Sequence, residues 1–434
     1  MGGSGGSWLG PGGTPPIHAF TGFYDIVVVK LDANGNYLWH TFFGGSNGDQ
    51  GISIALNSEG DIFVAGLSQS SWQGTGDVNP LHAYAGDYDI AVLKLNNDGG
   101  YLWHTFYGSL ARDGSNGIAV DTQGAVSIAG YSYGDWEDQS ISPIHPHSSV
   151  KDIAVLKLSG DGAYLWHTFY GTQEDDHAQA IAVDEQDNLY VTGNSNYGWS
   201  GDQDIAPIHS HSGDDDLFVL KLNPSGAYQW HTFYGSDLME YGQAIIFDRQ
   251  NSLIVAGDSF ASWNGDGGVA PLHAHSIDYD FTVLKLSTDG AYQWHTFYGS
   301  TVDEYVYGVA VTGKGNIFVA GESYRAWLGD EDADPLHPYA GVNDITLLQV
   351  GADGSYAWHT FYGSEGDDMG IGGDDYACDI AVDGMGNLIL TGASESSWLG
   401  DGGAAPLHPH DEEGDDFTVL KFAGGEYYLP LLQR

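Results

Sequence analysis

A repeated tryptophan motif constrains the fold of this chain more than any other feature. The string Trp-His-Thr-Phe begins at Trp39, Trp103, Trp166, Trp230, Trp294 and Trp358, with spacings of 64, 63, 64, 64 and 64 residues. A second series holds the other seven tryptophans, and only its last step, of 71 residues, departs from this period: Trp8, Trp72, Trp136, Trp199, Trp263, Trp327 and Trp398. An internal period of this length indicates an array of similar units, not two or three unrelated domains.

Each unit contains four short runs of β-branched and aromatic residues. In the unit from Ala180 to Gly242 the runs cover 180–184, 189–193, 216–222 and 228–234, and a loop of about 20 residues separates the second from the third. Such runs predict strands, which we name a, b, c and d, and no helical periodicity competes with them. A four-stranded antiparallel sheet with two apolar faces cannot bury both alone. The sequence therefore predicts an all-β fold, a β-propeller with a repeat of about 64 residues.

Three segments of this unit, residues 181–193, 216–222 and 228–235, resemble the seven-bladed β-propeller repeat family (SBBP). The similar motifs are Ile-Ala-Val-Asp, Tyr-Val-Thr-Gly, Asp-Leu-Phe-Val-Leu-Lys-Leu and a Thr-Phe-Tyr-Gly ending. The resemblance covers essentially the whole chain and implies a prokaryotic extracellular or cell-surface protein. It implies no shared catalytic residues. The sequence departs from the family in its long b–c loop, which carries a tryptophan and a Pro-Leu-His or Pro-Ile-His group.

The number of strands predicts an incomplete blade. Strand c occurs seven times, strands a and b six times, and a divergent seventh strand d follows at 427–432. We expect one propeller over 1–434 with six full blades and a partial one, seven blades being favoured. The expected boundaries are a partial blade over 1–50 and repeats near 51–115, 116–177, 178–241, 242–305, 306–375 and 376–434.

The N-terminal segment Gly2–Trp8 has the register of Gly66–Trp72, so we expect the chain to start just after a strand b. Met1–Ser7 lacks the charged and apolar regions of a signal peptide. Two explanations of the missing strands stay open: the chain is a fragment of a longer one, or a neighbouring subunit supplies the strands. The second predicts a homo-oligomer or filament.

The b–c loops supply the candidate ligand-binding residues. An aromatic face beside polar groups suits a sugar, and this predicts a site formed by one tryptophan and one histidine per loop. The alternative, which we favour, is that each tryptophan anchors its long loop. The candidates are Trp72, Trp136, Trp199, Trp263, Trp327, Trp398, His82, His145, His209, His273, His337 and His408.

The aspartates suggest two interpretations. An aspartate begins every strand c, from Asp25 to Asp416, and such a residue commonly accepts backbone N–H groups in a turn. Adjacent aspartates also suit Ca²⁺, although no spacing matches an EF-hand. The candidate calcium ligands are Asp214, Asp215, Asp367, Asp368, Asp374 and Asp375.

Composition excludes several functions. With 59 acidic and 12 basic residues and a net charge of −47, the chain lacks the cations that bind nucleic acid. No run approaches the roughly 18 apolar residues of a membrane span. The strand-d histidines, among them His40 and His104, are expected to be hydrogen-bonded structural groups.

No catalytic motif is found, so we expect a protein that is not an enzyme and has no certain cofactor. The predicted function is an extracellular or cell-surface scaffold for adhesion, which interacts with surface proteins or glycans. A carbohydrate-binding propeller that uses one tryptophan loop per blade is the alternative. An enzyme acting on polysaccharide is a third possibility, which the symmetry of the repeats disfavours.

Overall fold

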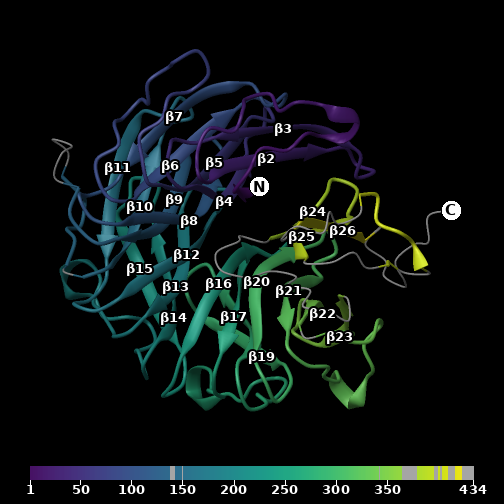
Figure 1. The fold of residues 1–434 in the computed structure, drawn as a ribbon. Coiled ribbons are helices and arrows are strands. Elements are labelled where there is room, and N and C mark those ends of the chain that lie inside the picture. Colours follow the sequence, from purple (N-terminus) through teal and green to yellow (C-terminus); the bar gives the residue numbers. More distant parts are fainter. Residues whose placement is uncertain are drawn as a thin grey trace. The chain divides into compact units, whose positions relative to one another are not determined.

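The computed structural model covers the 434-residue chain and describes all residues except 137–141, 149, 342, 364–378, 395–398, 401–402, 409–415 and 423–434. The described strands form seven sheets, of which five have four strands and two have three (Figure 1). Helical structure in the described part is limited to short 3-10 turns. The prediction of an all-β, seven-bladed propeller with antiparallel blades is confirmed.

The strand bounds repeat from sheet to sheet. The first sheet contains β1 (Gly2–Ser4), β2 (Asp25–Leu31) and β3 (Tyr37–Phe43). The next contains β4 (Asp49–Leu56), β5 (Ile62–Ser68), β6 (Asp89–Leu95) and β7 (Tyr101–Tyr107), and the third β8 (Asp113–Val120), β9 (Val126–Ser132), β10 (Asp152–Leu158) and β11 (Tyr164–Tyr170). The fourth contains β12 (Asp176–Val183), β13 (Leu189–Ser195), β14 (Asp216–Leu222) and β15 (Tyr228–Tyr234).

The other three sheets have the same order. They contain β16 (Glu240–Phe247), β17 (Ser252–Ser259), β18 (Asp280–Ser287) and β19 (Tyr292–Tyr298); β20 (Glu304–Val311), β21 (Ile317–Ser323), β22 (Asp344–Val350) and β23 (Tyr356–Tyr362); and β24 (Ile380–Val382), β25 (Leu388–Ser394) and β26 (Asp416–Phe422). The 3-10 turns lie in b–c loops: η1 (Pro11–Gly13), η3 (Asp202–Asp204), η4 (Asp266–Gly268) and η5 (Asp330–Asp332).

The first strand corrects one prediction. Gly2 pairs with Val27 and Ser4 with Asp25, as Ser68 at the end of β5 pairs with Asp89. Residues 2–4 are therefore the last three residues of a strand b, and the expectation that the chain starts after this strand was wrong. The predicted seventh strand d at 427–432 lies outside the described residues.

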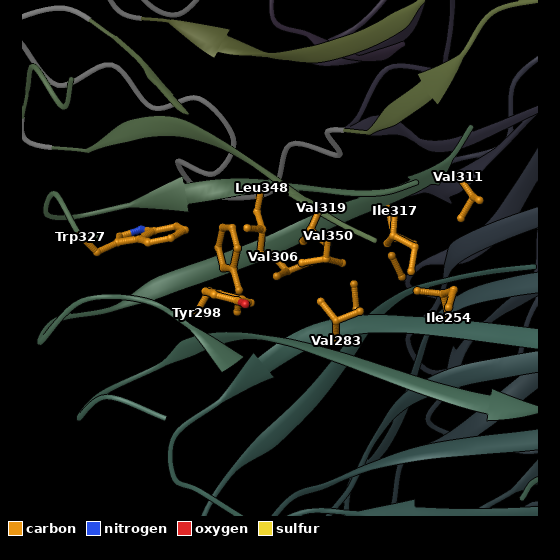
Figure 2. Close-up of a cluster of buried hydrophobic side chains, with 14 of the residues drawn as sticks. Ile254, Val283, Tyr298, Val306, Val311, Ile317, Val319, Trp327, Leu348 and Val350 are labelled. Atoms are coloured by element: carbon orange, nitrogen blue, oxygen red, sulfur yellow. The ribbon is translucent and has the colours of Figure 1, made fainter. Parts of the chain in front are cut away.

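Both faces of the strands are buried, because neighbouring sheets pack against one another. In β5, Phe63 and Ala65 belong to one hydrophobic cluster, whereas Ile62 and Val64 belong to another. Figure 2 shows an equivalent cluster that runs from Trp327 through Val319 to Val311. Alternation along each strand thus supplies apolar side chains to both faces, as the propeller prediction required.

A glycine near the end of strand b accommodates a bulge in strand a. The β4–β5 register shifts between Gly51 and Ser53, and a Cβ on the facing Gly66 would overlap the carbonyl oxygen of Gln50. The glycines Gly130, Gly193 and Gly257 face the same obstruction. The atom that requires a glycine here belongs to the neighbouring strand of the same sheet.

The b–c loop covers the free edge of strand d. The N–H of Leu81 donates to the carbonyl oxygen of His104 (3.0 Å), and the N–H of Phe106 donates to that of His82 (3.3 Å). The proline before Leu81 is suited to this extended segment because its φ is fixed. Covering an edge strand in this way prevents it from pairing with another chain.

By its internal contacts the chain divides into two compact units. One contains Met1–Pro207 and Phe218–His231, and the other Ile208–Leu217 and Thr232–Arg434. No helix among the described residues is long and apolar enough to span a membrane.

Candidate ligand-binding site at the blade seams

The loop tryptophans are buried. Trp72, Trp136, Trp199, Trp263 and Trp327 are between 3% and 7% exposed, and Trp398 lies outside the described residues. Each ring stacks on a strand-d histidine; the Trp263 and His295 centroids, for example, lie 3.8 Å apart with an interplanar angle of 8°. This burial favours the anchor interpretation. Ligand binding by these indoles stays a prediction.

The strand-d histidines are structural, as expected. The hydroxyl of Tyr101 donates to Nδ1 of His104 (2.8 Å), and Nε2 of His104 donates to the carbonyl oxygen of Trp72 (3.1 Å). Burial lowers the pKa of His104 to about 4, and the contact with the Trp72 carbonyl opposes this only in part. His231, His295 and His359 bond to the equivalent tyrosine and tryptophan of their own repeats. Burial lowers the pKa of each of them to about 4 as well. These rings are therefore neutral in the folded protein at pH 7.

The loop histidines have one nitrogen engaged and one available. Nδ1 of His18 donates to the carbonyl oxygen of Phe42 (2.8 Å), which leaves Nε2 as an acceptor. His82, His145, His209, His273 and His337 make the same bond to the equivalent phenylalanine. His408, whose side chain is exposed, completes the candidate histidines.

A hydrogen bond that we call the latch joins consecutive repeats beside these histidines. The tyrosine at the end of strand d donates from its hydroxyl to the aspartate that follows the next loop tryptophan by three residues. The latch joins Tyr170 to Asp202 (3.2 Å), Tyr234 to Asp266 (3.2 Å) and Tyr298 to Asp330 (3.3 Å). Burial and the charge of Asp330 raise the pKa of Tyr298, so its hydroxyl keeps its proton.

The first seam, between the β1–β3 and β4–β7 sheets, lacks both latch residues. Phe43 stands at the tyrosine position and Thr75 at the aspartate position. A groove of about 610 Å³ lies here, lined by residues that include His18, Gln73, Asp77 and Asn79. Gln73 Nε2 donates to Asn79 Oδ1 (3.0 Å), which leaves an amide oxygen and an amide N–H available.

Below the loops, each of five seams holds two buried carboxylates. The pairs are Asp25 and Asp49, Asp89 and Asp113, Asp152 and Asp176, Asp216 and Glu240, and Asp280 and Glu304, and none is more than 1% exposed. The second member always follows the first by 24 residues. A Cβ on Gly108 would lie 2.8 Å from Asp89 Oδ1 and 2.9 Å from Asp113 Oδ2, so both carboxylates flank this glycine.

Backbone and hydroxyl groups hold the carboxylates in place. Ala85 N–H donates to Asp89 (2.7 Å), as the turn interpretation of the strand-c aspartates predicted. Ser109 N–H donates in the same way to Asp113 (2.6 Å), which begins a strand a. Burial raises the pKa of Asp89 to about 7, and the charge of Asp113 adds to this shift. Burial and the charge of Asp280 raise the pKa of Glu304, the second carboxylate of another pair, to about 8. A buried pair of this kind favours one shared proton over two charges.

The sequence reasoning missed the second carboxylate of each pair, although its constant 24-residue spacing was a usable signal. It also left out Gln73, Asp77 and Asn79. The signal for this seam was that Phe43 and Thr75 replace the tyrosine and the aspartate found in later repeats.

The proposed calcium ligands do not converge in the described part of the chain. Asp214 is exposed and Asp215 half-buried, and the described residues contain no group of three metal-ligating side chains. Asp367, Asp368, Asp374 and Asp375 lie outside the described residues. Calcium binding therefore stays a prediction.

Two curated relatives match part of this chain. An uncharacterized WD repeat-containing protein, L264, of Acanthamoeba polyphaga mimivirus is 22% identical and matches 63% of this chain and 24% of its own length. The chain thus spans about a quarter of the length of the curated relatives that it matches.

Two solved structures are also similar. The Pan2 WD40 domain of Neurospora crassa has a TM-score of 0.40 at 8% identity and covers 79% of this chain and 75% of that domain. A gluconolactonase of Xanthomonas campestris has a TM-score of 0.33 at 13% identity and covers 77% and 87%. The beta-propeller repeat family, SBBP, matches residues 165–197 of this chain, which span β11, β12 and β13.

Proposed function

We propose that this chain is a binding scaffold that acts outside the cell or at its surface, holds partner proteins through its loops and carries out no reaction itself. The observation that carries the proposal is an aliphatic side chain exposed at the same loop position in seven repeats, directly before the loop histidine. These residues are 43–69% exposed: Ile17, Leu81, Ile144, Ile208, Leu272, Leu336 and Leu407. A recurring exposed apolar group suits contact with another protein.

The hydrogen bonding of the repeats supports a role without catalysis. Five strand-d histidines bond through both ring nitrogens: His40, His104, His231, His295 and His359. Backbone N–H groups of tight turns hold buried carboxylates such as that of Asp89. A general base needs a free lone pair within reach of a substrate. In these repeats the strand-d histidines and the buried carboxylates instead stabilise turns and loops.

The test is binding of the purified chain to cell envelopes of the organism that encodes it. We expect saturable binding that is lost when the envelopes are treated with protease, and that weakens at least tenfold in a variant with Leu81→Ser, Leu272→Ser and Leu336→Ser. The matched control is Leu110→Ser, an exposed leucine (82%) outside these loops. Binding that survives protease but not periodate oxidation would contradict the protein partner and favour a glycan.

Light scattering tests the second prediction, self-association. A 46.5 kDa species at all concentrations would contradict an assembled homo-oligomer or filament, whereas larger species would support strand donation by a neighbouring subunit.

A further inference from the structure

The first seam differs from the latched seams in its chemistry, and the difference leaves polar groups available. At the Tyr298 seam, the tyrosine hydroxyl and the Asp330 carboxylate bond to each other, and His273 Nε2 lies 3.8 Å from the same carboxylate. At the first seam neither Phe43 nor Thr75 can form this bond. Thr75 stands where Asp330 stands at the Tyr298 seam, and His18 is one of the residues that line the groove.

The groove has the volume of a small-ligand site. Its volume of about 610 Å³ falls within the range of roughly 300–1,000 Å³ typical of ligand pockets. Four glycines, Gly44, Gly45, Gly74 and Gly76, are among its lining residues and expose backbone to it.

The lining groups define the ligand class. His18 Nε2, the Gln73 amide oxygen and the Asp77 carboxylate accept hydrogen bonds, and the Asn79 amide donates them. Asp77 is the charged group, and the twelve lining residues contain no lysine or arginine, so an anionic ligand would be repelled. Neighbouring acceptors and donors of this kind match the vicinal hydroxyls of a sugar.

We propose that the first-seam groove binds a neutral oligosaccharide of two or three sugar units through His18, Gln73, Asp77 and Asn79. The proposal goes beyond the scaffold role, because it concerns one groove and not the recurring loops. Trp72 is also among the lining residues, but it is 5% exposed and its ring stacks on His104, so the proposal assigns the ligand contacts to the four polar residues.

Isothermal titration calorimetry of the full chain with a panel of neutral disaccharides and trisaccharides tests the proposal. The panel contains cellobiose, lactose, maltose, mannobiose, chitobiose and their trimers. We expect at least one to bind, with a Kd that rises at least tenfold in Asn79→Ala and in Gln73→Ala. The matched control is Asn264→Ala, at the position of Gln73 in a later repeat, which should leave the Kd unchanged.

The sharpest variant combines Phe43→Tyr with Thr75→Asp and so installs the latch at the first seam. It should abolish sugar binding while its thermal midpoint stays at or above that of the wild type. Absence of binding to the whole panel at millimolar sugar would overturn the proposal. So would binding that Asn79→Ala and the double variant leave intact, or binding that a chelator abolishes. Envelope binding in the earlier experiment would remain in each case, so the two proposals fail separately.

Discussion

The first seam and the three latched seams share their interior and differ at their rim. A loop tryptophan stacks on a strand-d histidine at Trp72 as at Trp263, and Asp25 and Asp49 are buried together as Asp280 and Glu304 are. At the rim, the pair Tyr298 and Asp330 is replaced by Phe43 and Thr75. We therefore expect the buried stacks and carboxylate pairs, which recur, to determine stability. The residues at the tyrosine and aspartate positions, which differ between seams, can change binding.

The shared tryptophan should have the largest effect on folding. Trp263→Ala removes a buried ring that stacks on His295 and should lower the free energy of unfolding by about 3–5 kcal/mol, measured by chemical denaturation. Leu328→Ala, at an exposed leucine (49%), is the control. A loss below about 1 kcal/mol, together with lost sugar binding, would favour the ligand-platform interpretation of the loop tryptophans.

The shared carboxylate pairs should make stability depend on pH. The folded pKa of Asp89, about 7, is above its unfolded value, so its contribution is complete below about pH 4 and is lost as the pH rises through 7. The free energy of unfolding of the wild type should therefore fall as the pH rises from 5 to 8. The fall in Asp89→Asn should be smaller by on the order of 2–4 kcal/mol. Thermal unfolding measures this.

The control for this prediction is the exposed Asp87→Asn, which should follow the wild-type profile. The strand-d histidines act in the opposite direction, because a folded pKa of about 4 for His104 means stability lost as the pH falls below about 6.5. Only the difference between variant and wild type isolates the carboxylate pair. Equal slopes for the two would contradict a shared proton at this seam.

Removing the hydroxyl of the tyrosine that bonds to a strand-d histidine should have a smaller effect on the free energy of unfolding. Tyr101→Phe removes the hydroxyl that donates to Nδ1 of His104 and leaves a buried acceptor unpaired. We expect a loss of about 1–3 kcal/mol in the free energy of unfolding. Tyr197→Phe, at an exposed ring (59%), should change it little. Equal losses in the two variants would show that the bond to His104 is not the cause.

The latch should have the smallest effect, because Asp330 is half-exposed. Tyr298→Phe should cost about 0.5–1 kcal/mol. Phe43→Tyr alone should not raise the free energy of unfolding. In a double-mutant cycle, Phe43→Tyr with Thr75→Asp should show a favourable coupling energy of about 0.5–1 kcal/mol. A coupling of zero would mean that the rim exchange has no part in keeping the first seam open.

The fold was predictable because the residue pattern itself is periodic. Strands c and d were predicted at 216–222 and 228–234, which are the bounds of β14 and β15. Strand a was predicted from Ala180, but β12 begins at Asp176. Its first residues are polar and contain a bulge between Ala178 and Ala180, which interrupts the alternation that marks a strand.

The candidate site was less predictable, because its contacts join residues far apart in the sequence. Trp199 bonds and stacks with His231, 32 residues away, so its burial could not be read from the loop alone. The groove lies at the seam where Phe43 and Thr75 replace the tyrosine and the aspartate of the latch. A search for recurring residues finds what the repeats share. The first seam instead stands out because two recurring residues, the tyrosine and the aspartate, are replaced there.

The loop segment that lies along strand d also bears on how such a chain can lengthen. In each of several repeats the residues before the loop histidine bond to the outer strand of the same repeat, at Leu81, Ile144, Leu272 and Leu336. Duplication of one unit would therefore copy a strand together with the segment that shields it. New copies would arrive already protected against amyloid-like stacking, so gene duplication could extend the array without a compensating mutation elsewhere.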